Sequence, residues 1–178
     1  MTHELKNRIV SYSVTYLDDG ELSFVEVDDV STYGNRDTPE GAAAAEIMVV
    51  GWNIQRDYSL WSCTFNIEQT PDHKFVLASN RLGPIFNITN PNHQNKTEIK
   101  SDSLATFKPT KSGKLEFVEL APSGGLHPRH FSLNKNGSMI AVANQISGTV
   151  LVYARDVATG KIAKQIAATY GLGLGELT

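Results

Sequence analysis

The sequence predicts an all-β fold in which short antiparallel strands are joined by tight turns. Three observations carry this prediction. Short runs of residues either alternate between apolar and polar with a period of two or are wholly apolar. Turns rich in Gly, Asn and Asp separate the runs, and Asn136-Gly137 is a strong hairpin signal because both residues tolerate positive φ. The same pattern occurs more than once along the chain, which indicates repeated sheet units.

The C-terminal part of the chain contains four such runs, at 130–133, 138–143, 149–154 and 161–167. Four consecutive antiparallel strands make a sheet unit of about the size of one β-propeller blade. The run 138–143 is too apolar to be half solvated, so we expect both of its faces to be buried. The expected buried residues of this unit are Phe131, Leu133, Met139, Ile140, Val142, Val150 and Val152.

Two further strands are expected near the N-terminus, at 8–16 and 22–27, around the turn Asp18-Asp19-Gly20. They resemble the outer strand pair of such a unit and form a half-blade at about 8–30. The next unit begins at 42–50. Its Ala-rich start favours a helix when taken alone, but its position just before a strand pair favours an inner strand.

The segment 51–69 has no clean period of two or 3.6, and it contains both tryptophans and the single cysteine. It separates 42–50 from 70–81, which would otherwise form one hairpin. The sequence leaves open whether the segment is an extra strand, a natural loop or foreign sequence read through in a gene model. We expect it to be dispensable, because its removal would join the two strands of a standard hairpin.

An internal repeat relates the two C-terminal units, aligning 70–81 with 134–145 and 102–120 with 148–166. In this alignment Asn80 corresponds to Asn144, and Arg81 corresponds to Gln145. The first unit is lengthened by 85–100, a stretch rich in Asn, Thr, Lys and His that we expect to be a loop.

Repeats at near-blade length predict a partial β-propeller with about two to three four-stranded antiparallel blades. The single domain 1–178 then comprises the half-blade, a blade at about 42–121 with insertions at 51–69 and 85–100, and a blade at about 128–167. A closed ring needs at least about four blades, so we expect a fragment or a product truncated on its N-terminal side. Its end sheets would leave apolar faces without a neighbour, and we expect marginal stability and self-association through these open faces.

Composition limits the function classes. The chain has 178 residues, and its net charge of −3 gives no sign of a nucleic-acid partner. No apolar run is long enough to span a bilayer, and 1–7 is too polar for a signal peptide, so we expect a cytoplasmic protein without a membrane partner. No residues show the spacing of metal ligands and no phosphate-binding loop is evident, so we expect no metal and no cofactor.

Polar residues lie on either side of the C-terminal hairpin. His127, Arg129 and His130 lie at the start of its first strand, and Asn144 and Gln145 lie at the end of its second strand. The entry of the first strand and the exit of the second lie at the same end of a hairpin. By the geometry of a propeller, the expected neighbours at the mouth of the central channel are Arg81, His127, Arg129, His130, Asn144 and Gln145. Glu46 lies on an inner strand, where it would point into the channel or pair with a cation such as Arg81.

Several motifs together indicate a family: Ala44-Glu46-Ile47, Pro71–Arg81, Asp102-Ser103 with Phe107, Gly124-Gly125, Pro128–Phe131 and Asp156–Lys161. On these residues the chain resembles the C-terminal part of the lactonase family of seven-bladed β-propellers. That family includes bacterial 6-phosphogluconolactonase and fungal 3-carboxy-cis,cis-muconate cyclase. The resemblance covers roughly 42–165, apart from 51–69, which departs from the family pattern.

The resemblance implies that the substrate is a small acidic lactone or carboxylate, either a sugar lactone that is hydrolysed or a muconate that is closed to a lactone. The implied catalytic residues are Arg81, His130 and Glu46, and the implied substrate-binding residues are Arg129, His127, Asn80, Asn144 and Gln145. A guanidinium such as that of Arg81 would clamp a carboxylate or stabilise a developing enolate. His127 or His130 would be the general base.

Structural roles for the same residues stay open. Arg81 and Glu46 suit salt bridges between blades, Arg129 suits a strut to backbone carbonyls, and the histidines suit structural hydrogen bonds. A second function class also fits the sequence, namely a non-catalytic propeller fragment that binds a ligand or partner on its channel face, or an inert truncated product.

Overall fold

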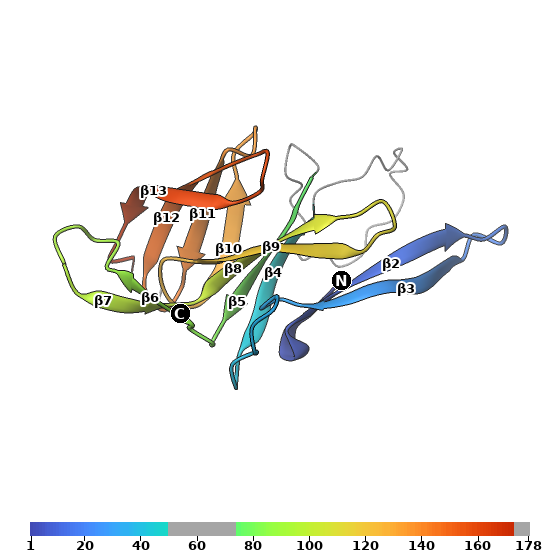
Figure 1. Ribbon diagram of the computed structural model, residues 1–178, viewed down its shortest axis with the longest axis horizontal. Helices are drawn as coiled ribbons and strands as arrows, with labels where there is room; N and C mark the ends of the chain where they lie inside the picture. Colours follow the sequence, from blue (N-terminus) through green and yellow to red (C-terminus); the bar gives the residue numbers. More distant parts are fainter. Residues whose placement is uncertain (50–73, 173–178) are drawn as a thin grey trace, which may run out of the picture.

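Three β-sheets lie side by side in chain order, and a small separate hairpin lies beside the last of them (Figure 1). This computed structural model describes residues 1–49 and 74–172. The predicted all-β fold of antiparallel sheets is confirmed. The segment 51–69, which we predicted to be dispensable, lies outside the described residues.

The last sheet contains β10 (Pro128–Leu133), β11 (Met139–Asn144), β12 (Thr149–Arg155) and β13 (Ile162–Thr169), paired in that order. The turn between β10 and β11 forms as the Asn-Gly signal predicts, because Gly137 adopts a φ of 70° and donates its N–H to the carbonyl of Asn134 at 2.9 Å. Asn144 is the last residue of β11, whereas the sequence had suggested that it leaves the sheet.

The second sheet contains β4 (Ala43–Val49), β5 (Val76–Arg81), β8 (Ser103–Pro109) and β9 (Leu115–Pro122), again paired in chain order. Between β5 and β8, β6 (Phe86–Thr89) and β7 (Glu98–Ser101) pair with each other. The expectation of a loop at 85–100 was therefore wrong, because Phe86 and Ile88 alternate with polar residues and Ile88 pairs with Ile99 across the hairpin.

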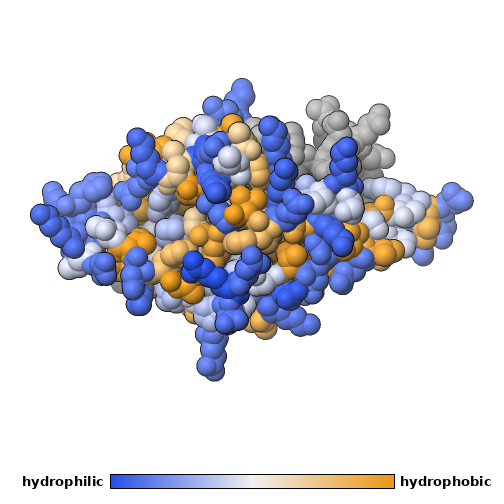
Figure 2. All heavy atoms as spheres, viewed as in Figure 1, coloured by the Kyte–Doolittle hydropathy of each residue, from blue (hydrophilic) through white to orange (hydrophobic). Residues whose placement is uncertain are grey.

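The first sheet contains β1 (Thr2–His3), β2 (Arg8–Tyr16) and β3 (Leu22–Ser31), with a 3-10 turn, η1 (Glu4–Lys6), between β1 and β2. β1 pairs only with the first two residues of β2. Ser11 and Asp28 still bond to the chain at Gly113 and Leu115 in the β8–β9 hairpin of the second sheet, and beyond them the far end of the β2–β3 hairpin projects away from the other sheets (Figure 1). Apolar residues are visible on its surface (Figure 2).

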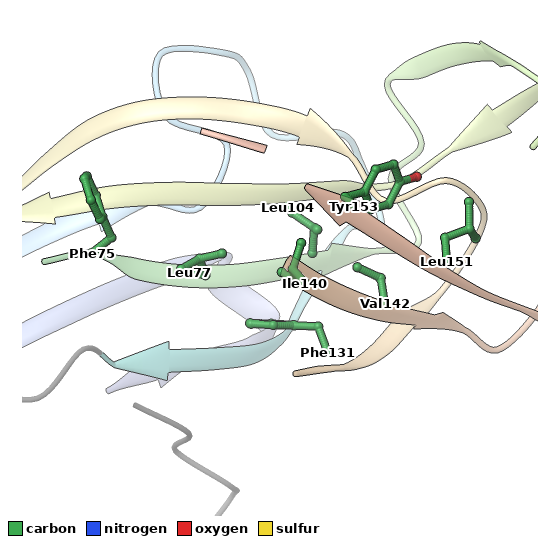
Figure 3. Close-up of a cluster of buried hydrophobic side chains, with 8 residues drawn as sticks. All are labelled: Phe75, Leu77, Leu104, Phe131, Ile140, Val142, Leu151 and Tyr153. Atoms are coloured by element: carbon green, nitrogen blue, oxygen red, sulfur yellow. The ribbon is translucent and has the colours of Figure 1, made fainter. Parts of the chain in front are cut away.

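Two apolar clusters join the sheets. The cluster between the second and last sheets consists of Phe75, Leu77, Leu104, Phe131, Ile140, Val142, Leu151 and Tyr153 (Figure 3). The cluster between the first and second sheets consists of Ile9, Val76, Ala78, Ala105 and Phe107. Neighbouring residues of β5 thus enter different clusters, as expected for a strand that is covered on both faces.

The last sheet buries only one of its faces. Phe131, Ile140 and Val142 are buried as predicted, but Leu133, Val150 and Val152 are half-buried and Met139 is 38% exposed. The prediction that 138–143 is buried on both faces was therefore wrong. Leu151 and Tyr153 pair in register with Val142 and Ile140 and share the buried face, so their neighbours on β12 point to the opposite face.

Candidate functional site

The guanidinium of Arg81 connects all three sheets. Arg81 ends β5, and its side chain is only 14% exposed. One of its terminal nitrogens lies 2.9 Å from Nε2 of His127, in the segment that leads into β10. Its other terminal nitrogen forms an ion pair with the carboxylate of Glu4 in η1. The sequence placed Arg81 and His127 together at the channel mouth, and the structure brings them into direct contact.

His127 adopts an unusual backbone conformation that two neighbours hold in place. Its φ is 65°, a region that costs a residue other than glycine about 1–3 kcal/mol. Its N–H donates to a carboxylate oxygen of Asp102 at 2.8 Å, and its carbonyl accepts the N–H of Gln145 at 2.9 Å. These bonds direct the imidazole towards Arg81.

The electrostatics favour a neutral imidazole. Burial lowers the pKa of His127, the charges of Arg81 and Arg129 lower it further, and Asp102 opposes them. A neutral His127 can accept a hydrogen bond at Nε2 from the Arg81 guanidinium. Burial and the charge of Arg129 also lower the pKa of Arg81, so the two guanidinium groups lie within electrostatic reach of each other.

Sequence reasoning missed two members of this cluster. Asp102 is 1% exposed, and its second carboxylate oxygen accepts the N–H of Gly83 at 3.0 Å. It thus fixes both the segment after Arg81 and the segment that carries His127. The sequence singled out Asp102 only as part of the family motif Asp102-Ser103, and an acidic residue just before the start of β8 was the available signal for its role. Nothing in the sequence pattern relates Glu4 to Arg81, because their contact joins two sheets that no strand pairing connects.

Asn80 and Asn144, which we expected to bind substrate, lie in the interior, although Asn144 was expected at the channel mouth. Their exposed fractions are 0% and 1%. The amide nitrogen of Asn80 donates to the carbonyl of Thr32 at 2.9 Å, and that of Asn144 donates to the carbonyl of Ser123 at 3.1 Å. In both repeats, therefore, the asparagine ties its sheet to the chain just beyond the last strand of the preceding sheet.

The remaining predicted residues take different positions. Arg129 and Gln145 are exposed beside His127. His130 is also exposed, pairs in register with Ala143, and lies on the opposite face of β10 from the buried Phe131. The backbone of Glu46 belongs to β4, but its side chain lies outside what the structure describes.

Within residues 1–49 and 74–172, no helix has the length and apolar character of a membrane span. No group of three or more His, Cys, Asp and Glu side chains in these ranges is arranged to hold a metal ion.

Comparison with known proteins agrees with the fold. The model of the family "Lactonase, 7-bladed beta-propeller" matches residues 1–171. A 6-phosphogluconolactonase from Formosa agariphila is 37% identical over 100 residues, which are 56% of this chain and 24% of that protein. A 6-phosphogluconolactonase from Bacillus subtilis is 28% identical over 125 residues, covering 70% of this chain and 30% of its own length.

Solved structures match over nearly the whole chain. A protein from Lactobacillus plantarum superposes with a TM-score of 0.61 at 22% identity, covering 94% of this chain and 36% of its own. The periplasmic gluconolactonase of Pseudomonas aeruginosa gives a TM-score of 0.61 at 20% identity, with coverage of 94% and 35%. The chain spans about a quarter to a third of the length of these proteins. On the family match, the chain belongs to the lactonase family of seven-bladed β-propellers.

Proposed function

We propose that Arg81, His127 and Arg129 bind the acidic group or the carbonyl of a small lactone, as part of a site that hydrolyses sugar lactones. The observation that carries this proposal is the 2.9 Å contact between Arg81 and His127, whose pKa is lowered by burial and by the charges of Arg81 and Arg129. The family membership and the similarity to two 6-phosphogluconolactonases support the substrate class.

The cluster has the parts that lactone hydrolysis requires. Water adds to the lactone carbonyl, the ring C–O bond breaks, the ring oxygen takes up a proton to become a hydroxyl group, and the new carboxylic acid ionises to a carboxylate and releases one proton. The two arginines would stabilise the negative charge that develops on the carbonyl oxygen. His127 would accept the proton of the attacking water at Nε2 once the Arg81 guanidinium has turned from this nitrogen to the substrate, because its lowered pKa leaves the imidazole unprotonated near neutral pH. His130, the other candidate base, lies on the opposite face of β10 from Phe131.

Calorimetric titration with 6-phosphogluconate, the product of the expected reaction, tests the site. Arg81→Ala should weaken binding by about 10- to 100-fold, because a hydrogen bond to a charged group contributes about 1.5–3 kcal/mol. Arg8→Ala is the matched control, since Arg8 lies on β2 and pairs with Asp29 at 2.6 Å. Equal binding by the Arg81 variant and the unaltered chain would contradict the site.

Hydrolysis of 6-phosphogluconolactone, followed by acid release at constant pH, tests the reaction. The unaltered chain should release acid faster than the uncatalysed background, and Arg81→Ala should not. Binding that depends on Arg81 without any turnover would instead identify a ligand-binding module. Ring closure of 3-carboxymuconate without lactone hydrolysis would identify the cycloisomerase reaction.

A further inference from the structure

One face of the β2–β3 hairpin is mostly apolar and carries aromatic residues. Its apolar residues are Tyr12, Val14, Tyr16, Leu22 and Phe24, with Glu26 opposite Tyr12, and we call it the outer face. Val14 pairs in register with Phe24, and the rings of Tyr12 and Phe24 meet edge to face at 6.4 Å. Tyr16 is 75% exposed and Phe24 59%. In Figure 2, apolar residues are visible on this projecting hairpin.

The repeat shows what such a face contacts in the other sheets. Tyr12, Phe107 and Tyr153 are each the fifth residue of β2, β8 and β12, and each follows a register shift in its sheet. Phe107 and Tyr153 are 1% and 7% exposed, because the preceding sheet packs against them. Tyr12 is only half-buried, since no sheet among the described residues precedes it. In the second and last sheets, the surface equivalent to the outer face is therefore covered by the preceding sheet.

The last sheet presents the complementary surface. On its far face, which points away from the core, the two middle strands carry Met139, Ala141, Ala143, Val150, Val152 and Ala154. These six side chains are apolar and most are small, and the outer strands add His130, Ser132, Ala167 and Thr169 in register beside them. The second residues of β2 and β8 are Ile9 and Leu104, and through them the first two sheets pack against the sheet that follows. Val150 is the second residue of β12 and occupies the same position on the far face.

We propose that the outer face of the first sheet binds the far face of the last sheet of a second copy of this chain. The contact would continue the sheet-on-sheet stacking that already joins the three sheets within one molecule. It is head-to-tail, with different surfaces on the two partners, so each copy retains one unused face and growth continues until a ring closes. The proposal does not depend on the proposed function.

Single substitutions to lysine test the two surfaces separately. Phe24→Lys blocks the outer face, and Val152→Lys blocks the far face. Val25→Lys is the matched control, because Val25 is 60% exposed and lies next to Phe24 on the opposite face of the hairpin. Met139→Lys is a second far-face variant for the case that Val152→Lys does not fold, since Met139 is already 38% exposed. A cooperative thermal melt establishes that each variant is folded.

Analytical ultracentrifugation gives the decisive readout. The unaltered chain and Val25→Lys should show sedimentation coefficients that rise with concentration through the micromolar range, whereas each blocked variant alone should remain a monomer. An equimolar mixture of Phe24→Lys with a far-face variant should form a dimer that grows no further, because one intact face of each kind remains. A monomeric unaltered chain, association that persists in Phe24→Lys, or a mixture that stays monomeric would overturn the proposal.

Discussion

Asp102 shows how a single buried carboxylate can shape a site without facing a ligand. Its two oxygens accept N–H groups from Gly83 and His127, which belong to segments that no strand pairing joins. Arg81 lies two residues before Gly83, and His127 is itself the second N–H donor to Asp102. The distance between the guanidinium and the imidazole is therefore set largely by a residue that is 1% exposed.

Asp102→Asn should destabilise the fold by about 2 kcal/mol. An asparagine retains one acceptor oxygen but turns an NH₂ group towards a backbone N–H, so one charge-assisted hydrogen bond is lost and its donor stays unsatisfied. Urea denaturation followed by circular dichroism measures the loss. Asp156→Asn is the control, because Asp156 caps an exposed turn through the N–H groups of Ala158 and Thr159, and it should have a smaller effect. Equal losses in the two variants would contradict the role of Asp102.

His127 should make the folded state sensitive to mild acid. Its pKa in the folded state lies below the ordinary value of 6.5, so the unfolded chain binds a proton more readily. The stabilisation is fully present above pH 6.5 and is lost as the pH falls through the folded-state pKa. His127→Gln should therefore lose less stability than the unaltered chain over this interval. Urea midpoints measured on either side of pH 6.5 test this, with His93→Gln, a change at an exposed position, expected to behave like the unaltered chain.

At the scale of elements, the buried asparagines act as ties between sheets. Asn80 reaches Thr32 beyond β3, and Asn144 reaches Ser123 beyond β9, so the repeat extends from strand order to individual hydrogen bonds. Each amide also bonds a hydroxyl on the strand beside it, at Ser103 and Thr149 respectively. Such hydrogen bonds fix the position of one sheet relative to the next. Apolar packing alone specifies that position less well.

Asn80→Ala should lower the free energy of unfolding by about 2 kcal/mol, because a buried carbonyl loses its partner and the removed side chain leaves a small void. Thermal and urea unfolding measure the change. Asn87→Ala, on the exposed side of β6, is the matched control and should change stability little. An unaltered midpoint for Asn80→Ala would show that the tie to Thr32 contributes nothing.

The period-two pattern was sufficient to predict most strands and the hairpin at Asn136-Gly137, but not which face of β12 is buried. Val150 and Val152 are as apolar as Leu151, so alternation alone could not decide between the two faces. Propeller geometry predicted that Arg81 and His127 lie close together, because the exit from the second strand of one sheet and the entry to the first strand of the next lie on the same face, and the structure shows them in contact. The contributions of Asp102 and Glu4 could not be predicted in this way, since they depend on loop conformation and on how separate sheets stack.

At the scale of the whole molecule, the described sheets are stacked in series, and the apolar clusters form between consecutive sheets. This arrangement makes stability approximately a sum of sheet terms and nearest-neighbour interfaces. Head-to-tail association would add one more interface of the same kind for each copy. Association should therefore also raise the melting temperature of the end sheets, which have an apolar cluster on only one side within the described residues.

The ion pair between Glu4 and Arg81 has a consequence for affinity. The chain carries its own carboxylate on the guanidinium that an acidic ligand would use. A ligand that needs this position binds only molecules in which Glu4 has moved away, so its apparent dissociation constant equals the intrinsic one divided by the fraction of such molecules. On the proposed function, the 3-10 turn at Glu4–Lys6 would act as an intramolecular competitor, and binding of an acidic ligand would be coupled to release of that turn.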